Sequence, residues 1–262
     1  MSSSEIIYGT NPVLEALRAG KRRCHQLFVS EGRREADVKA VEEEAARRRV
    51  PVKRVPREEL TKLAQTEKNQ GVALRCDPFS YDGLEALVER ALSDERKGFL
   101  VVLDGITDPQ NLGSIVRTAH LMGVHGIVLP RDNAAGVTPA VVKSSAGATE
   151  YLPIAQVTNI AETLRYIKER GFWVIGAAGE SSDMIYLHDF KGYNVALVLG
   201  AEGSGIRRLV RERCDYLLSV PMEGAVGSYN VSVAGALFMG EVARQRWLSI
   251  RAKSVPKSEQ LP

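Results

Sequence analysis

The chain has 262 residues, of which 44% are hydrophobic and 26% charged, the balance of an ordinary globular protein. No apolar run is long enough to span a membrane, and the first residues lack the basic and apolar regions of a signal peptide. We therefore expect a cytoplasmic protein without a membrane partner. The formal net charge of +3 is compatible with nucleic-acid binding but does not require it.

The three cysteines, Cys24, Cys76 and Cys214, are odd in number and far apart in the sequence. With this number and spacing of cysteines, we expect neither a disulfide framework nor a four-cysteine zinc site. We interpret them as ordinary reduced thiols.

Residues 1–75 alternate short strand-like and helix-like runs, which predicts a small α/β domain. Turn signals at Asp77-Pro78 and Asp82-Gly83 end it, and residues 76–98 form a linker with a lead-in helix. The expected strands are 26–30, 51–55 and 71–75, and the expected helices are 34–49, 57–64 and 84–92.

From residue 99 the chain alternates continuous apolar strands with helices, which predicts a parallel sheet covered on both faces. This second domain covers residues 99–248, and a loose polar tail, 249–262, follows it. The expected strands are 99–103, 126–129, 172–176, 195–199 and 216–220. The expected helices are 111–122, 138–144, 159–170, 206–212 and 230–247.

Three loops follow strands of the predicted parallel sheet, at residues 104–113, 200–205 and 220–234. Ligands of open parallel sheets bind at the carboxyl ends of the strands. Glycines in these loops let backbone groups approach a ligand closely. The third loop precedes a long helix, and Ser228 and Asn230 stand where an N-cap belongs.

The usual site fingerprints are absent from the sequence. The second loop reads Gly-x-x-Gly-x-Gly, which is not the Rossmann pattern, and neither a Walker A sequence nor a Gly-x-Ser-x-Gly elbow occurs. The four histidines form no pair with metal-ligand spacing. A dinucleotide-dependent oxidoreductase, a hydrolase of this type and a metal site are therefore disfavoured.

Each polar residue of the three loops has a purely structural interpretation when it is taken alone. Asn111 is best placed as the cap of its helix, and Arg117, six residues on, is a surface salt-bridge partner or reaches back or across an interface. Glu202 is a solvated loop acid, and Ser228 and Asn230 are caps. The joint occurrence of these residues at strand ends favours a ligand site instead.

The three loops, in this order, resemble the three sequence motifs of the SpoU branch of the SPOUT RNA methyltransferases. The matching segments are residues 104–117, 197–205 (LVLGAEGSG) and 220–234 (VPMEGAVGSYNVSVA). Residues 8–13 and 69–73 are similar to the L30e-like RNA-binding domain that precedes the catalytic domain in members acting on 23S rRNA. The resemblance covers nearly the whole chain.

The resemblance implies a C-terminal SPOUT domain with a deep trefoil knot, S-adenosylmethionine as cofactor, a homodimer and no metal. It implies methylation of a ribose 2′-hydroxyl, that of a guanosine in 23S rRNA. Matched position by position, the catalytic residues are Asn111, Arg117, Glu202, Ser228 and Asn230. The cofactor contacts are backbone atoms of Gly200, Val220 and Tyr229. The family usually has Leu at position 229 and often Ser at position 227, where this chain has Tyr and Gly.

RNA binding is expected at Lys21, Arg22 and Arg23, a basic loop without an adjacent acid. The helix that follows mixes basic residues 47–49 with acidic residues 42–44, so a solvated face explains it equally well.

Two other functions stay open. One is a 2′-O-methyltransferase that acts on tRNA or on an adenosine of rRNA. The other is a non-catalytic RNA-binding protein in ribosome assembly, which the complete set of motif residues disfavours.

Overall fold

The computed structural model describes residues 4–254, which fold into two compact units. Unit 1 comprises the described residues up to 81 together with segments 108–117 and 135–152. Unit 2 comprises residues 82–107, 118–134 and the described chain from 153. Unit 1 therefore includes two segments from the region that the sequence analysis assigned wholly to the second domain.

Unit 1 is built on a four-stranded sheet in the order β1-β4-β2-β3, in which only β2 and β3 are parallel neighbours. Helices α1, α2 and α3 each contribute fully buried apolar side chains, among them Val13, Val38 and Leu60. The elements are β1 (Glu5–Tyr8), α1 (Thr10–Ala19), β2 (Cys24–Ser30), α2 (Glu35–Arg47), β3 (Val52–Val55), α3 (Arg57–Ala64), the 3₁₀ turn η1 (Glu67–Asn69), β4 (Val72–Cys76), α6 (Pro139–Ser144) and the 3₁₀ turn η2 (Ala148–Glu150).

The predicted elements between residues 26 and 76 are all present, with ends that shift by at most two residues. No element was predicted for residues 5–19, where the structure has β1 and α1. Gly9 separates these two elements with a φ of 98°, which favours glycine, and Gly20 ends α1 in the left-handed region. With only four residues, β1 is too short to show an alternating pattern.

Unit 2 contains a six-stranded sheet in the order β10-β8-β9-β5-β6-β7, and every neighbouring pair is parallel. The predicted α/β fold with a parallel sheet is confirmed. Its elements are α4 (Leu84–Leu92), β5 (Phe99–Asp104), β6 (Gly126–Pro130), β7 (Ile154–Val157), α7 (Ile160–Glu169), β8 (Phe172–Ala177), the 3₁₀ turn η3 (Ile185–Leu187), β9 (Asn194–Gly200), α8 (Arg208–Arg211), β10 (Tyr216–Leu218) and α9 (Val231–Ser254). Helix α5 (Pro109–Leu121) links β5 to β6 along the chain.

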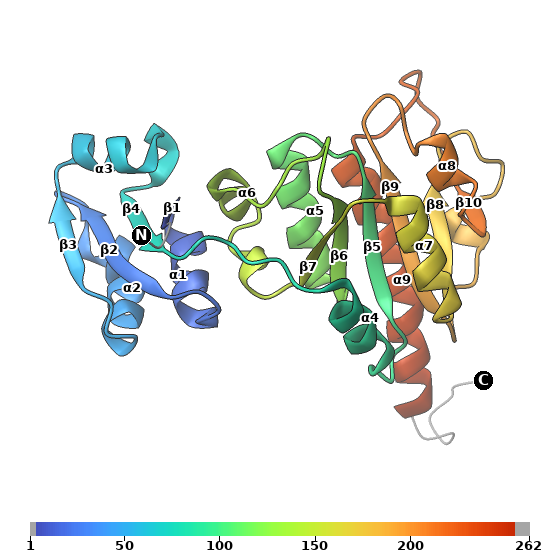
Figure 1. The fold of residues 1–262 in the computed structure, drawn as a ribbon, viewed down its shortest axis with the longest axis horizontal. Coiled ribbons are helices and arrows are strands. Elements are labelled where there is room, and N and C mark those ends of the chain that lie inside the picture. The colour runs from blue at the N-terminus through green and yellow to red at the C-terminus, as the bar shows by residue number, and fades with distance from the viewer. Residues whose placement is uncertain (1–3, 255–262) are drawn as a thin grey trace, which may run out of the picture. The chain divides into compact units, whose positions relative to one another are not determined.

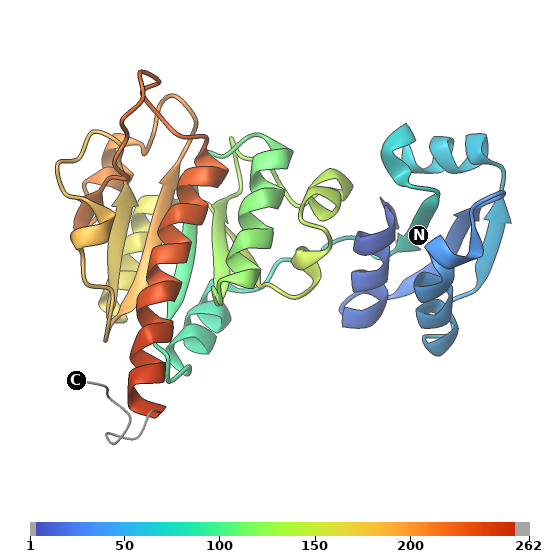
Figure 2. The same ribbon diagram turned by 180° about the vertical axis from the view of Figure 1, so that it is seen from behind.

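Helices cover both faces of this sheet (Figures 1 and 2). Leu87 of α4 and Leu164 of α7 belong to one apolar cluster with Val102 and Val198 of the central strands. Helix α9 packs on the other face, where its Gly235 lies against Leu199. Because both faces are covered, the strands are apolar along their whole length, which is the pattern that predicted them.

The structure corrects the sequence analysis at three places in unit 2. Strand β7 was not predicted, and β10 ends at Leu218 instead of continuing to residue 220. Helix α9 continues to Ser254, although residues 249–262 were expected to be a loose tail. No glycine or proline interrupts the chain between residues 241 and 255, so nothing local stops the helix. The rest of the predicted tail, 255–262, lies outside the described residues.

None of the described helices combines the length and apolar character needed to cross a membrane.

Candidate functional site

A cavity of about 490 Å³ lies at the carboxyl ends of β8, β9 and β10 in unit 2. Three chain segments form its walls: the loop after β8, the loop after β9, and the loop from β10 into α9. This is the edge at which parallel sheets bind ligands. The predicted site residues among its lining are Gly200, Glu202, Val220, Ser228, Tyr229 and Asn230.

The loop after β9 is a tight turn closed by its own backbone. Ala201 and Gly205 exchange two backbone hydrogen bonds, of 3.1 and 2.9 Å. A Cβ on Gly200 would lie 2.2 Å from the carbonyl carbon of Gly205 and 2.3 Å from the backbone nitrogen of Ile206. Glycine is therefore required at position 200 for a steric reason, and its absence of a side chain leaves the backbone open to the cavity.

A buried carboxylate holds the returning end of the same loop. Asp104 ends β5 beside Gly200 in the parallel register, and its side chain is fully buried. It accepts hydrogen bonds from the backbone nitrogen of Arg207 at 2.9 Å and from Nε of Arg207 at 2.7 Å. No role in the site was predicted for Asp104 from the sequence. The available signal was a carboxylate at the end of an apolar strand, which is too general to identify its partner.

The second and third loops are joined by a side-chain hydrogen bond. Asn230 donates from Nδ2 to Oε1 of Glu202 at 2.6 Å. The Oδ1 atom of Asn230 also accepts from the backbone nitrogen of Ser232 at 2.9 Å, so Asn230 is the N-cap of α9. One side chain thus fixes the start of the helix and ties the two loops together. Ser228 lies two residues earlier, is exposed and lines the cavity without capping the helix.

Tyr229 finds room for its ring at the surface of the cavity. Its side chain is partly exposed, and its hydroxyl donates to the backbone oxygen of Pro221 at 3.3 Å. Val220, by contrast, is buried. Tyr229, where the resemblance led us to expect leucine, is therefore accommodated within the third loop itself.

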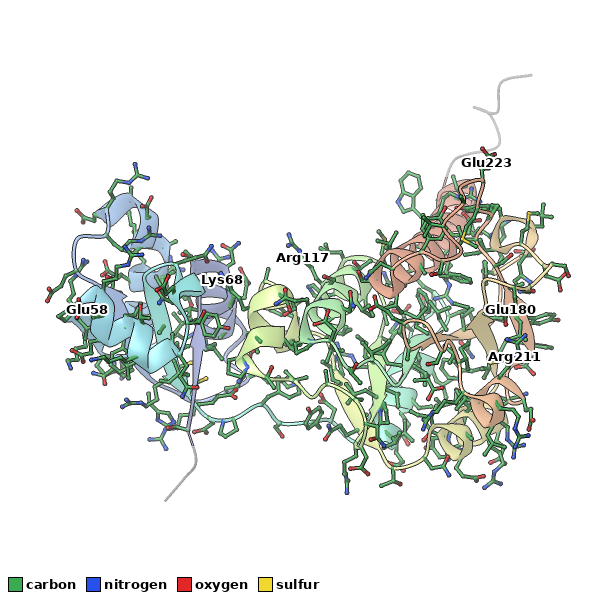
Figure 3. All side chains as sticks on the ribbon, turned by 90° about the horizontal axis from the view of Figure 1, so that it is seen from above. Glu58, Lys68, Arg117, Glu180, Arg211 and Glu223 are labelled. Carbon is green, nitrogen blue, oxygen red and sulfur yellow. The ribbon has the colours of Figure 1, made fainter. Side chains whose placement is uncertain are left out.

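Glu180, after β8, also lines the cavity, and it was not predicted from the sequence. The pKa of its carboxyl group is lowered by a hydrogen bond from its own backbone amide and, to a smaller extent, by one from Arg211. These two effects outweigh desolvation, which raises the pKa. Figure 3 shows Glu180 and Arg211 side by side, and the two form an ion pair. A Gly179-Glu180 pair at the end of an apolar strand was the signal that could have found it.

The charges of the cavity indicate which ligand it suits. Glu180 and Glu202 are the charged residues among its lining, and none of the lining residues is Arg, Lys or His. A polyphosphate ligand would lack a cationic partner there. Apolar side chains, including Leu199 and Phe238, supply the remaining surface. The cavity therefore fits a flat, neutral ring system joined to a cationic group.

The two remaining predicted catalytic residues lie on α5, within unit 1, and are not among the lining of the cavity. Asn111 was expected to be the cap of this helix, and that expectation is wrong. The helix begins at Pro109, and the carboxylate of Asp108 accepts from the backbone nitrogens of Gln110 and Asn111 at 3.1 and 3.4 Å. Asn111 is buried in the first turn, whereas Arg117 is exposed and points away from the helix (Figure 3).

The predicted RNA-binding loop in unit 1 is corrected at one position. Arg22 is only 7% exposed and donates to Glu150 at 3.0 Å from Nε, and it also pairs with Glu5. Its guanidinium is thus used inside the protein and is not presented to RNA. Lys21 and Arg23 are exposed, and Lys21 lies 5.4 Å from the centre of the Phe79 ring.

Among residues 4–254, no group of three or more His, Cys, Asp or Glu side chains is placed to hold a metal ion.

Two family models match the chain. The model described as the SpoU rRNA Methylase family matches residues 98–240, and the model described as RNA 2′-O ribose methyltransferase substrate binding matches residues 6–82. The first covers more than half of the chain and includes the whole cavity.

Curated relatives align over almost their full length. The chain is 43% identical over 249 residues to the 23S rRNA (guanosine-2′-O-)-methyltransferase RlmB of Pseudomonas aeruginosa, which covers 94% of this chain and 98% of the relative. It is 41% identical over 251 residues to the protein of the same name from Ralstonia nicotianae, with coverages of 94% and 98%.

The fold is similar to that of a solved SpoU methyltransferase, AviRb from Streptomyces viridochromogenes, in complex with the cofactor AdoMet. The TM-score is 0.77 at 24% identity, over 94% of this chain and 91% of that chain.

Proposed function

The chain belongs to the SpoU rRNA methylase family, and we propose that it transfers a methyl group from S-adenosylmethionine to the 2′-hydroxyl of a guanosine in 23S rRNA. The names of its relatives from Pseudomonas and Ralstonia support the choice of 23S rRNA and of guanosine. The match to the substrate-binding model over residues 6–82 supports an RNA substrate over a small molecule.

The observation that carries this proposal is the cavity closed by the Asn230–Glu202 hydrogen bond. S-adenosylmethionine combines a neutral adenine with a cationic sulfonium, and the lining offers backbone edges, apolar surface and two carboxylates. Adenine edges are read by backbone N–H and C=O groups in tight loops, which Gly200 and Val220 provide. The bound cofactor supplies an electrophilic methyl group, and the protein must bring the ribose oxygen into line with it.

Within this proposal, Arg117 and Asn111 act on the RNA. Arg117 is exposed, and among the described residues it makes no ion pair, so its N–H groups are available to a phosphate or to the reacting oxygen. A guanidinium does not lose its proton in proteins, so Arg117 stabilises the developing alkoxide and is not itself the base. Glu202, Ser228 and Asn230 are proposed to orient cofactor and ribose from the cavity side, and the backbone of Tyr229 contacts the cofactor.

The finer features of the fold are part of the proposal. We propose that residues 99–248 form a SPOUT domain with a trefoil knot, and that residues 1–75 form an L30e-like RNA-binding domain joined by residues 76–98. The matches over 98–240 and 6–82 support this division. The cytoplasm, where ribosomal RNA is made in bacteria, is the proposed location.

A homodimer is also proposed, and an exposed apolar patch in unit 2 supports it. Leu121 and Met122, at the end of α5, are 71% and 38% exposed, and Trp247 and Leu248 on α9 are 56% and 45% exposed. Leu121, Met122 and Trp247 line one groove. Apolar patches of this kind mark interfaces between subunits.

Mapping of 2′-O-methyl groups in ribosomal RNA tests the function. Cells that lack the protein should lose one methylguanosine of 23S rRNA, and the wild-type gene should restore it. The Arg117→Ala variant should fail to restore it, while its affinity for S-adenosylmethionine, measured by calorimetry, stays at the wild-type value. An unchanged methylation map in the deletion strain would refute the proposed function. Loss of cofactor binding or of dimerisation in Arg117→Ala would refute only the role of Arg117.

A further inference from the structure

We propose that unit 1 holds one unpaired nucleotide of the RNA substrate in a second cavity, at the carboxyl ends of β2 and β3. This inference rests on the proposed function, because it takes RNA to be the substrate of the protein. It differs from the expected RNA contact at residues 21–23, because it uses other residues and a concave site.

The second cavity has a volume of about 340 Å³, within the range of small-molecule sites. Strands β2 and β3 run parallel and end together at Ser30 and Val55, and α3 begins just beyond (Figure 1). The cavity thus occupies the strand-end position in unit 1 that the first cavity occupies in unit 2. Its lining consists of residues 30–33, Arg57, Glu67 and 69–71.

One wall of this cavity is held rigidly by Asn69. The side chain is 4% exposed, and its Nδ2 donates to the backbone oxygen of Thr66 at 2.8 Å. Its Oδ1 accepts from the backbone nitrogen of Gly71 at 2.8 Å. Gln70 and Gly71, which both line the cavity, adopt left-handed φ values of 56° and 70°. A preformed wall lowers the ordering cost of binding.

Two arginines on the cavity lack full partners. The stem of Arg33 packs on Gly71, where an added Cβ would lie 2.9 Å from Arg33 Cδ. Its Nε is buried and makes no hydrogen bond within residues 4–254, and its Nη1 is 4.0 Å from the carboxylate of Asp37. Arg57 is exposed at the first position of α3 and has no ion pair among the described residues. Guanidinium groups with spare donors bind phosphate bidentately and stack on bases.

The acidic side chains of the cavity indicate whether its ligand is a bare phosphate or a nucleotide. Glu31 and Glu67 line it together with Arg33 and Arg57, so its charges balance. Carboxylates repel a phosphate, but they accept hydrogen bonds from the imino and amino groups of a base. A nucleotide satisfies both kinds of side chain, with its phosphate on the arginines and its base edge on the acids. Bases are available in this way only where RNA is unpaired.

The test compares RNA affinities of the full-length protein and of two variants. A fluorescein-labelled, unpaired RNA of mixed sequence is titrated, and binding is followed by anisotropy. Loss of the arginine contacts in the double variant Arg33→Gln/Arg57→Gln should weaken binding about tenfold. The matched control is Arg34→Gln, because the Arg34 side chain is 84% exposed, pairs within residues 4–254 with Asp37 alone and lies outside the lining. Its affinity should stay within about twofold of wild type.

Further measurements separate the possible outcomes. Equal urea-unfolding curves in all three proteins would show that unit 1 of each variant is folded, and equal S-adenosylmethionine affinity would show the same of unit 2. Ultraviolet cross-linking of wild-type protein to 4-thiouridine RNA should label residues 30–33 or 69–71. Unchanged RNA affinity in the double variant, or cross-links confined to other segments, would overturn the inference. Failure of the wild-type protein to methylate any rRNA would refute the proposed function instead, because RNA affinity is read without methylation.

Discussion

Replacement of Gly200 by alanine tests whether the loop after β9 forms the cofactor cavity through its tight backbone. The new Cβ would lie 2.2 Å from the carbonyl carbon of Gly205 and 2.3 Å from the nitrogen of Ile206. Ordinary contacts begin at 3.4 Å, so the facing backbone must retreat by the difference of 1.2 Å. Both neighbours are main-chain atoms, and no flexible side chain can absorb the shift.

The free-energy cost follows from these contacts. Overpacking against backbone costs about 1–3 kcal/mol. The retreat also breaks at least one of the two hydrogen bonds between Ala201 and Gly205, at about 0.5–1.5 kcal/mol. We expect the free energy of unfolding to fall by about 2–4 kcal/mol, which leaves a domain of ordinary stability folded. The affinity for S-adenosylmethionine should fall at least about tenfold, because the displaced loop is a wall of the cavity.

Urea unfolding and calorimetric titration with S-adenosylmethionine measure the two effects. The matched control is Gly83→Ala, since nothing lies within 4 Å of a Cβ at Gly83 and its φ is −73°. Gly83 precedes α4, outside the cavity, so this variant should bind the cofactor normally and lose at most about 1 kcal/mol. Wild-type affinity and stability in Gly200→Ala would show that the loop is not rigid and would refute the steric argument.

Three other substitutions probe charged groups. Asp104→Asn weakens the interaction with Arg207, whose side chain is 58% exposed and is then hydrated by water. We expect the free energy of unfolding to fall by about 1–3 kcal/mol and the Kd for S-adenosylmethionine to rise at unchanged kcat, whereas an unchanged Kd would contradict this role. Hydrogen bonds from Arg96 hold the pKa of Asp94 well below its usual value of 3.8, so its stabilising effect is complete above that value and is lost as the pH falls toward the folded-state pKa. Asp94→Asn should therefore be less stable than wild type at pH 7, and the difference should shrink below about pH 4 in urea titrations; a constant difference would argue against the linkage. Arg22→Met leaves two acidic partners without a cation and should cost about 3–5 kcal/mol in chemical unfolding, whereas a loss below about 1 kcal/mol would mean that the pair is open to water.

The sequence by itself determined the features that depend on neighbouring residues. Continuous apolar runs predicted the strands of the parallel sheet, because helices cover both faces. Glycine positions predicted the tight loop after β9, and Asn230 was foreseen at the start of α9, where its own side chain caps the helix. The motif loops are contiguous in sequence, so their resemblance to a family was visible without a structure.

Only the tertiary structure decided which distant side chains meet. Glu202 and Asn230 are 28 residues apart, and Asp104 and Arg207 are 103 apart, yet each pair is joined by a hydrogen bond. Arg22 was expected to be exposed because no acid is adjacent in the sequence, but Glu150, 128 residues away, buries it. Local patterns act over a few residues, whereas these pairs depend on the order of strands in each sheet and on the path of the loops. The strand order places the ends of certain strands side by side, whatever their separation along the chain. The loops that follow these strands therefore line one cavity, although the sequence does not show that they are neighbours.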